Sequence, residues 1–275
     1  MEKKDYCNNC GNYGHSYSNC RHPILSYGII LYNINDNGDS KIIMVERKDS
    51  LSYIEFMRGK YKSIYDTEYI QLLFSRFSEK ELKFITEKDF DTLWEELWIH
   101  TETINPRIKR EYRKSKNDFN RLKKGYIRND IEINIEYLVN NIKKPYILNE
   151  WEIPKGRRKM YENNRECAIR EFYEETNVSH KNYKLYKNII PIVEEYTGIN
   201  RVRYKHVYYI GYIKDICDLK IDEKNKDQYT EIKTIKWCNE EECLQNIREY
   251  DLHKRNVIVN FFEYLRNHKN VVTME

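Results

Sequence analysis

Three glutamates crowd into one short segment of the chain, CAIREFYEET, as Glu171, Glu174 and Glu175. Their spacing of i, i+3 and i+4 places the three carboxylates on one face of a helix. Like charges at this spacing destabilise an isolated helix by about 0.2–0.5 kcal/mol per pair, which a bound cation would offset. Mg²⁺ and Mn²⁺ suit such a site, because they bind carboxylate oxygens and keep positions for water and substrate phosphates. The alternative is an acidic helix face turned to solvent.

The residues around these glutamates favour the metal site. Gly156 is followed after five residues by Glu162, and after seven more by the run REFYEETNV at 170–178. This pattern resembles the box of the Nudix hydrolases, G-x5-E-x7-R-E-U-x-E-E-x-G-U with U apolar, over residues 156–178. Asn177 stands where that box has its last glycine. Because asparagine tolerates the left-handed conformation, we expect Asn177 to end the helix as glycine would.

The resemblance implies a fold, a cofactor and roles for the box residues. The fold is α/β: the Nudix α/β/α sandwich with a mixed sheet, to which the patterns described below add a helical insertion domain and an N-terminal zinc knuckle. Glu171 and Glu175 would be the main ligands of Mg²⁺ or Mn²⁺, with Glu174 assisting and Arg170 orienting them together with Glu162. Hydrolysis of a phosphoanhydride needs charge neutralised on phosphate oxygens and an activated water, which such a site supplies.

Two further residues resemble parts of particular Nudix branches. Glu231 lies six residues before Trp237 in EIKTIKW. In a similar setting, the eukaryotic decapping branch carries a glutamate that acts as a further metal ligand or general base. The alternative is a surface glutamate at the start of a strand. Lys155 in WEIPKG resembles the Pro-Lys-Gly entry of decapping and diphosphoinositol-phosphate enzymes, where the lysine meets phosphate. A structural lysine is the alternative there.

The amino-terminal segment CNNCGNYGHSYSNC has the spacing of a zinc site, C-x2-C-x4-H-x4-C. Three thiolates and one imidazole complete a tetrahedral Zn²⁺ shell, so the site should be structural rather than catalytic. Its ligands would be Cys7, Cys10, His15 and Cys20. Gly11 and Gly14 would let so short a chain wrap around the ion.

This segment resembles the zinc knuckle, a module that grips single-stranded RNA or exposed bases. Tyr13 or Tyr17 could supply the stacking surface. A small folding staple or a protein-contact module remains the alternative. The metal-free peptide is too short to bury enough apolar surface, so metal removal should unfold it.

A strongly basic stretch, residues 106–128, carries ten Lys or Arg against Glu111 and Asp118, an excess of eight positive charges. Tyr112, Phe119 and Tyr126 lie between the cations, as in surfaces that bind nucleic acid. A solvated helical face is the equal alternative. The residues expected to bind RNA phosphates are Arg107, Lys109, Arg110, Arg113, Lys114, Lys116, Arg121, Lys123 and Lys124.

The elements that must position these residues follow from the apolar patterns. A hairpin is predicted for 24–34 and 41–48, a helical block for 63–142, strands within 183–197, 204–213 and 231–238, and helices at 240–250 and 253–268. We therefore expect a knuckle at 1–22, a Nudix domain in two parts at 23–62 and 146–275, and the helical insertion, which would bind RNA, at 63–145.

The composition excludes several classes of protein. With 275 residues, of which 40% are hydrophobic and 33% charged, the chain has the composition of a globular protein. Its net charge of +4 is too small to indicate, by itself, that it binds nucleic acid. No apolar run reaches 18 residues, and the first twenty residues are not a signal peptide. An odd number of cysteines, seven, favours metal ligands and reduced thiols over disulfides. We expect a soluble, cytoplasmic protein.

Over residues 24–268 the arrangement is similar to the mRNA-decapping Nudix enzymes of large cytoplasmic DNA viruses, the African swine fever virus type and its giant-virus relatives. The tracts FDTLWEELWI and YKHVYYIGYI carry this likeness outside the box, whereas the knuckle falls outside the pattern. The likeness implies capped mRNA as partner and hydrolysis of the cap triphosphate to 7-methyl-GDP and 5′-monophosphate RNA. The alternatives are a diphosphoinositol polyphosphate or dinucleoside polyphosphate hydrolase, and a non-catalytic RNA-binding protein on a Nudix scaffold.

Overall fold

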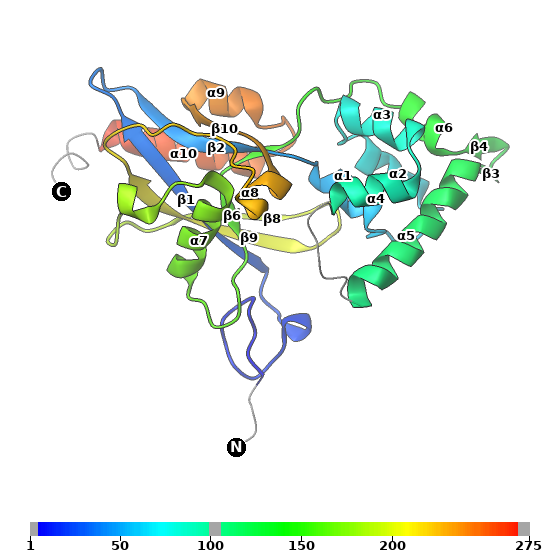
Figure 1. Cartoon of the computed structure of the whole chain (residues 1–275), viewed down its shortest axis with the longest axis horizontal. Helices are drawn as coiled ribbons and strands as arrows, with labels where there is room; N and C mark the ends of the chain where they lie inside the picture. The colour runs from blue at the N-terminus through cyan, green and yellow to red at the C-terminus, as the bar shows by residue number, and fades with distance from the viewer. Residues whose placement is uncertain (1–4, 99–105, 269–275) are drawn as a thin grey trace. The chain divides into compact units, whose positions relative to one another are not determined.

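The computed structural model describes residues 5–98 and 106–268, with the side chains of 106 and 107 left out. The chain divides into two compact units, residues 1–46 with 151–275, and residues 47–150 (Figure 1). The helical unit therefore takes in more chain on both sides than the insertion predicted for 63–145. Among the described residues, none of the helices combines the length and the apolar character needed to cross a membrane.

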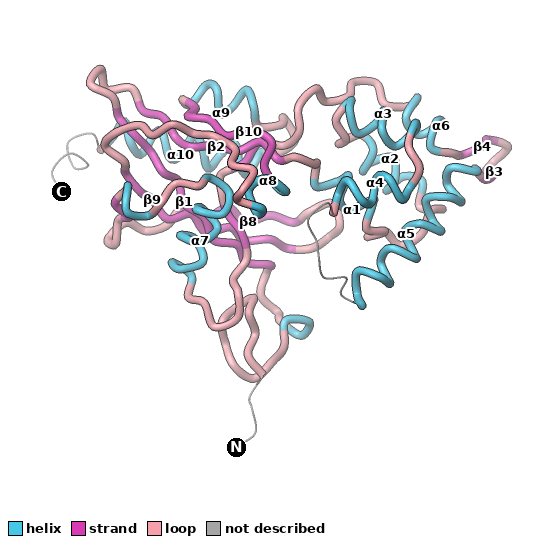
Figure 2. Tube along the Cα trace, in the orientation of Figure 1, coloured by secondary structure: helices cyan, strands magenta, loops and turns pink. Residues whose placement is uncertain are grey.

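The first unit is built on a mixed sheet (Figure 2). Strands β1 (Ile24–Ile34) and β2 (Ser40–Arg47) pair antiparallel, which confirms the predicted hairpin. Strand β9 (Arg203–Tyr212) runs parallel to β1 and pairs antiparallel with β8 (Ile192–Thr197). The remaining strands are β5 (Trp151–Glu152), β6 (Lys155–Gly156), β7 (Lys184–Leu185) and β10 (Ile232–Cys238). The core order is β10-β2-β1-β9-β7, with β5 on β2 and β6 on β1.

Helices cover both faces of this sheet, which gives the expected sandwich. Alternate residues of a strand point to opposite faces, so Ile42 packs with α10 (Leu252–Asn267) and α9 (Glu240–Asn246), whereas Ile43 packs with α7 (Asn164–Thr176). Helix α8 (Lys226–Glu231) leads directly into β10. The sheet thus holds α7, which carries the glutamates, against the strand pair β1 and β6.

The second unit is mainly helical, as predicted for this part of the chain. It contains α1 (Leu51–Met57), α2 (Thr67–Phe74), α3 (Glu79–Glu87), α4 (Phe90–Leu97), α5 (Pro106–Lys124) and α6 (Ile135–Asn140). Its core is aromatic, with Phe56 in ring contact with Phe74, Phe77 and Phe119. Short polar N-caps begin several of these helices, and Ser78 forms a capping box with Glu81.

A small hairpin interrupts the helical block, and here the sequence prediction was wrong. Strands β3 (Tyr126–Arg128) and β4 (Ile131–Ile133) pair across Asn129 and Asp130, both of which have positive φ. Two such residues form the tight turn whose twist suits a hairpin, and Asn and Asp tolerate it. The apolar spacing of a three-residue strand is too short to separate from a helical pattern.

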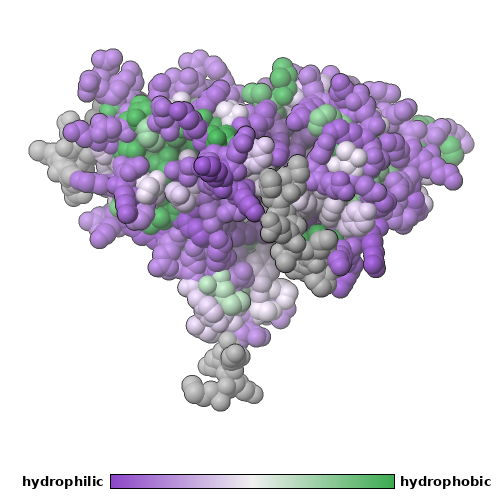
Figure 3. All heavy atoms as spheres, in the orientation of Figure 1, coloured by the Kyte–Doolittle hydropathy of each residue, from purple (hydrophilic) through white to green (hydrophobic). Residues whose placement is uncertain are grey.

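Hydrophilic residues cover most of the molecular face seen in Figure 3.

Candidate active site

Helix α7 carries the glutamate cluster, and its ends follow from local sequence. Asn163 caps the helix by accepting hydrogen bonds from the backbone N–H of Arg165 and Glu166, and Glu166 completes a capping box. The helix ends at Asn177, whose φ of 58° is left-handed. This confirms the prediction that asparagine replaces glycine at the end of the helix, so the departure from the box leaves the helix intact.

Arg170 organises the acidic face of α7. Its Nε and Nη2 donate to the two oxygens of Glu162 at 2.7 and 2.8 Å, a two-point ion pair. Its Nη1 donates at 2.7 Å to Glu171 Oε1 and to Glu174 Oε2. Burial opposes the charge on Arg170, but these carboxylates raise its pKa further above the ordinary value. One guanidinium thus fixes three of the box carboxylates.

Gly156 lies against the Glu171 carboxylate. A Cβ atom added at Gly156 would lie 2.6 Å from Glu171 Oε1 and closer still to the other two carboxylate atoms. Burial raises the pKa of Glu171, and the charges of Glu174 and Glu231 act in the same direction against the lowering effect of Arg170. Only glycine at the start of the box leaves room for this carboxylate.

Glu175 and Glu231 complete the acidic group from different elements. Glu175 is 5% exposed, and its Oε2 accepts from the backbone N–H of Lys155 at 3.2 Å. Glu231 is the last residue of α8 rather than the first of a strand. It is exposed, and Gln228 of the same helix donates to the backbone carbonyl of Glu175 at 3.1 Å, so α8 lies against the helix that carries the box glutamates.

For the side chain of Lys155, the structure favours the structural alternative. Its ammonium group pairs with Glu152, and the two side chains are 10% and 2% exposed. A buried carboxylate needs such a partner, because an unpaired buried charge is costly. The backbone of Lys155, by contrast, orients Glu175.

The donor set on α7 fits a hard divalent cation. All the donors are carboxylate oxygens, and around Glu162, Glu171 and Glu174 the two cations Arg170 and Lys159 face three carboxylates. A group of three or more His, Cys, Asp or Glu whose ligand atoms lie within 4.8 Å of one another could hold a metal ion. Among the described residues, such a group occurs at the amino terminus rather than on α7. The glutamate side chains would therefore have to converge to share one ion.

That amino-terminal group is Cys7, Cys10, His15 and Cys20, the predicted zinc ligands. Cys10 Sγ lies 3.3 Å from His15 Nε2. Burial opposes ionisation of Cys20, but hydrogen bonds from Asn9 and His15 lower its pKa to about 6, which favours the thiolate that a metal needs. Three sulfurs and one imidazole nitrogen fit Zn²⁺.

The chain wraps these ligands through two glycines. Gly11 and Gly14 have φ of 79° and 102°, as the sequence predicted for so tight a path.

The basic residues of α5 fall into two groups. Four make internal contacts: Lys114 with the carbonyl of Gly59, Lys116 with Asp91, Arg121 with the hydroxyl of Tyr65, and Lys123 with the carbonyl of Lys88. Four others are exposed and make no hydrogen bond or ion pair with the described residues: Lys109, Arg110, Arg113 and Lys124. The side chain of Arg107 lies outside the described residues. An RNA-facing surface on α5 therefore rests on the second group.

The sequence suggested that aromatic residues of the basic stretch form a stacking surface, but those on α5 do not form one. Phe119 is 1% exposed and belongs to the helical core, so it cannot stack on RNA. Tyr112 packs on Phe90 and Trp94 and donates its hydroxyl to Asp91. These aromatic residues follow the helical period because they hold α5 to its unit.

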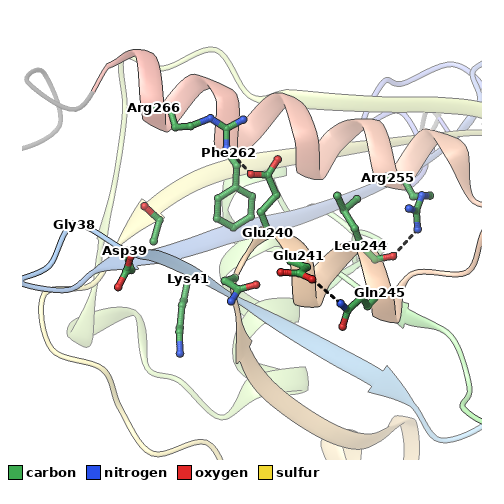
Figure 4. Close-up of a pocket in the computed structure, with 12 residues that line it drawn as sticks. Gly38, Asp39, Lys41, Glu240, Glu241, Leu244, Gln245, Arg255, Phe262 and Arg266 are labelled. Atoms are coloured by element: carbon green, nitrogen blue, oxygen red, sulfur yellow. Dashed lines mark hydrogen bonds and ion pairs between the residues drawn. The ribbon is translucent and has the colours of Figure 1, made fainter.

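A pocket of about 940 Å³ lies away from the box glutamates (Figure 4). The turn at Gly38 and helices α9 and α10 form its walls, and Arg266 pairs with Glu240 across them. Inside it Gln245 donates to Glu241 at 3.0 Å. Arg255 of its wall donates to the backbone carbonyls of Leu244 and Ile247, so these contacts of the pocket are structural.

Sequence reasoning missed Lys159 and Arg158, which lie at variable positions of the box. Lys159 Nζ pairs with Glu174 Oε1 at 2.9 Å. Arg158 is buried and lies between the knuckle and α7. A basic residue in a loop carries no local signal of its partner, so no sequence pattern could have found either contact.

Comparisons with known proteins agree with the box and extend beyond it. A model of the NUDIX domain matches residues 138–261. The chain is 30% identical, over 98% of its length and 96% of the relative's, to a protein of Acanthamoeba polyphaga mimivirus named "Putative mRNA-decapping protein". It is 25% identical, over 88% of its length and 96% of the relative's, to the mRNA-decapping protein g5R of African swine fever virus, isolate Warthog/Namibia.

Among solved structures, a Caenorhabditis elegans Ap4A hydrolase complex aligns over 88% of this chain and 98% of its own. The TM-score is 0.44 at 11% identity.

Proposed function

Because the chain belongs to the Nudix family, we propose that it is an mRNA-decapping enzyme, which hydrolyses the cap triphosphate of capped RNA to 7-methyl-GDP and 5′-monophosphate RNA. The observation that carries this is the Arg170-centred group of carboxylates on α7, held against Gly156. Nearly full-length likeness to viral proteins that bear the mRNA-decapping name supports the choice of substrate.

We propose that Glu171, Glu174, Glu175 and Glu231 hold Mg²⁺ or Mn²⁺. When bound, such an ion neutralises phosphate charge and lowers the pKa of water. Arg170 keeps Glu171 and Glu174 in place, and the backbone N–H of Lys155 does so for Glu175. Water adds to phosphorus, and the bridging oxygen leaves with the RNA as its 5′-monophosphate or with the guanosine as 7-methyl-GDP, according to the phosphorus attacked. The named products require cleavage of the anhydride between the phosphorus at the RNA 5′ end and the next one, and attack on either of these two atoms gives them.

The path of the RNA is proposed from the cations of α5. The exposed side chains of Lys109, Arg110, Arg113 and Lys124 offer positive charge to phosphates along one helix. The knuckle, with Zn²⁺ on its cysteines and histidine, would add a grip on unpaired bases, and Tyr13 is 61% exposed there. Action on transcripts would take place in host cytoplasm or a viral factory, where the product RNA becomes open to exonucleases.

The test is product identification with cap-labelled RNA of two lengths, in Mg²⁺ or Mn²⁺. The unaltered chain should release 7-methyl-GDP. Glu175→Gln should abolish this release, while its far-UV circular dichroism spectrum and its melting temperature remain those of a folded protein. Glu166→Gln is the matched control, because glutamine also serves in a capping box and should keep activity. Full activity of Glu175→Gln would refute the assignment.

The same assay with small substrates distinguishes the alternative. The exposed cations of α5 could instead clamp a small, highly charged ligand such as a diphosphoinositol polyphosphate or a dinucleoside polyphosphate. Faster turnover of those compounds than of capped RNA would favour that function. Equal turnover of free cap dinucleotide and long capped RNA would argue against RNA binding by α5.

A further inference from the structure

Arg158 joins the amino-terminal knuckle to the loop that begins the Nudix box. Its side chain is buried, at 8% exposure, although its neighbours Arg157 and Lys159 are exposed. Nη2 donates to the backbone carbonyl of Asn9 in the knuckle, and Nη1 donates at 3.0 Å to Asn164 Oδ1 at the start of α7. The guanidinium carbon also lies 5.5 Å from the Tyr27 ring of β1. One cation thus bridges the knuckle, strand β1 and the start of α7.

On the knuckle side, the contact falls on the residue that also meets a zinc ligand. Asn9 is 5% exposed, and its Nδ2 donates to Cys20 Sγ at 3.2 Å and to the carbonyl of Pro23 at 2.9 Å. Its Oδ1 accepts from the backbone N–H of Leu25 in β1 at 2.9 Å. The position of the Asn9 backbone carbonyl, which accepts the hydrogen bond from Arg158, therefore depends on the fold around the zinc ligands.

On the catalytic side, the loop at 157–163 supplies two partners of Arg170. The carbonyl of Arg157 accepts from Arg170 Nη2 at 2.9 Å, and Glu162 forms the two-point ion pair described above. A second contact couples the knuckle to this loop, because the rings of Tyr6 and Tyr161 lie 4.7 Å apart. A displaced loop would therefore displace Arg170, which holds Glu171 and Glu174.

We propose that Arg158 is a positioning residue through which the zinc knuckle holds the Nudix loop, and hence the metal-binding glutamates, in place. The knuckle is then part of the catalytic framework in addition to any contact with RNA. The inference rests on the proposed divalent-metal site of α7 and on zinc at the cysteines. Loss of zinc unfolds so small a module, and Arg158 then loses its acceptor at Asn9.

Two glycines of the knuckle provide a matched pair of variants. A Cβ atom at Gly11 would meet the Arg158 guanidinium, at 3.1 Å from Cζ and closer to Nη1, whereas a Cβ atom at Gly14 would meet nothing within 4 Å. Both glycines have positive φ, so alanine strains the backbone at either position. Gly11→Ala should therefore displace Arg158, and Gly14→Ala should report the backbone strain alone.

A second pair tests the arginine itself. Arg158→Lys keeps the charge but loses the planar fork that reaches two acceptors. Arg21→Lys makes the same chemical change at an exposed knuckle position with no hydrogen bond or ion pair to the described residues. Each full-length variant is first checked for bound zinc by metal analysis and for slow amide exchange in β9, so that general unfolding is recognised.

The readouts are amide hydrogen exchange of residues 157–163, Mn²⁺ affinity by electron paramagnetic resonance, and kcat and KM on free cap dinucleotide. In Gly11→Ala, Arg158→Lys and the zinc-free Cys10→Ser chain, we expect faster loop exchange and Mn²⁺ binding about 10-fold weaker or more, as for other partners that orient metal ligands. The kcat should fall by a similar factor with KM nearly unchanged. Arg21→Lys should match the unaltered chain, and zinc-bearing Gly14→Ala should lose clearly less than Gly11→Ala, because it adds backbone strain without touching Arg158.

Several results would overturn the proposal. Unchanged Mn²⁺ affinity in zinc-bearing Arg158→Lys and Gly11→Ala would do so, as would a loss confined to long RNA, which would make the knuckle an RNA grip only. Equal losses in Gly14→Ala and Gly11→Ala would assign the effect to knuckle strain and refute the role of Arg158. If the unaltered chain binds Mn²⁺ but releases no 7-methyl-GDP, the proposed function fails while the exchange and Mn²⁺ measurements still decide the role of Arg158.

Discussion

Replacing Gly156 with alanine tests whether the position of the Glu171 carboxylate sets the rate of hydrolysis. The added Cβ would lie 2.6 Å from Glu171 Oε1, whereas ordinary contact begins near 3.4 Å. The carboxylate must therefore retreat by about 1 Å, and it cannot do so without straining its hydrogen bond to Arg170. Gly156 itself is paired in the sheet with Tyr27, so its backbone has little freedom to yield.

The magnitude follows from that displacement. A shift of about 1 Å in a catalytic group can cost about 100-fold in rate, which corresponds to about 2.7 kcal/mol of activation free energy. Crowding of a packed site costs about 1–3 kcal/mol of folding stability in addition. We therefore expect Gly156→Ala to remain folded, to bind Mn²⁺ more weakly, and to release 7-methyl-GDP about 100-fold more slowly.

The assay is release of labelled 7-methyl-GDP from short capped RNA under single-turnover conditions, together with urea unfolding. Gly211→Ala is the control, because its Cβ would crowd Leu31 at 3.2 Å in the sheet, away from the glutamates. The control should lose stability without losing rate. A rate for Gly156→Ala within about threefold of the unaltered chain, well short of the loss expected for such a displacement, would show that the position of Glu171 does not matter.

Three other predictions concern separate parts of the chain. Reversing charge at Lys109, Arg110 and Arg113 should weaken RNA binding most at low salt and reduce the slope of log K against log salt by about 0.7 per lost contact, whereas Lys83→Glu, exposed on α3, should leave the slope unchanged. Burial alone would raise the pKa of Glu194, but the hydrogen bond from His206 and the charge of Lys254 lower it to about 2. The Glu194 carboxylate therefore stabilises the fold above pH 4.5 by about 3 kcal/mol, and this contribution is lost as the pH falls toward 2. In Glu194→Gln the free energy of unfolding by urea should therefore decrease less over that pH range. Asn177→Ala should cost about 1 kcal/mol in the same unfolding assay because of its left-handed φ, whereas Asn177→Gly should cost nothing; equal stability of the two would contradict the capping argument.

Patterns local in sequence were sufficient for the box, the Cys/His cluster at the amino terminus and the hairpin of β1 and β2. Each of these depends on residues a few positions apart, and short spacing maps directly onto a helix face, a turn or a metal shell. The same reasoning predicted that Asn177 would end α7. It failed at β3 and β4, where each strand is too short to show a period.

Contacts between distant segments came only from the tertiary structure. Which cations of α5 face solvent depends on partners as remote as Gly59, Tyr65 and Asp91, and the burial of Phe119 depends on packing within the helical unit. The hydrogen bond from Gln228 of α8 to the carbonyl of Glu175, and the bridge that Arg158 forms from the knuckle to the box loop, likewise join residues that are more than 50 positions apart. A side chain's type and its neighbours in sequence do not specify such a partner, because the folding of the whole sheet brings the two together.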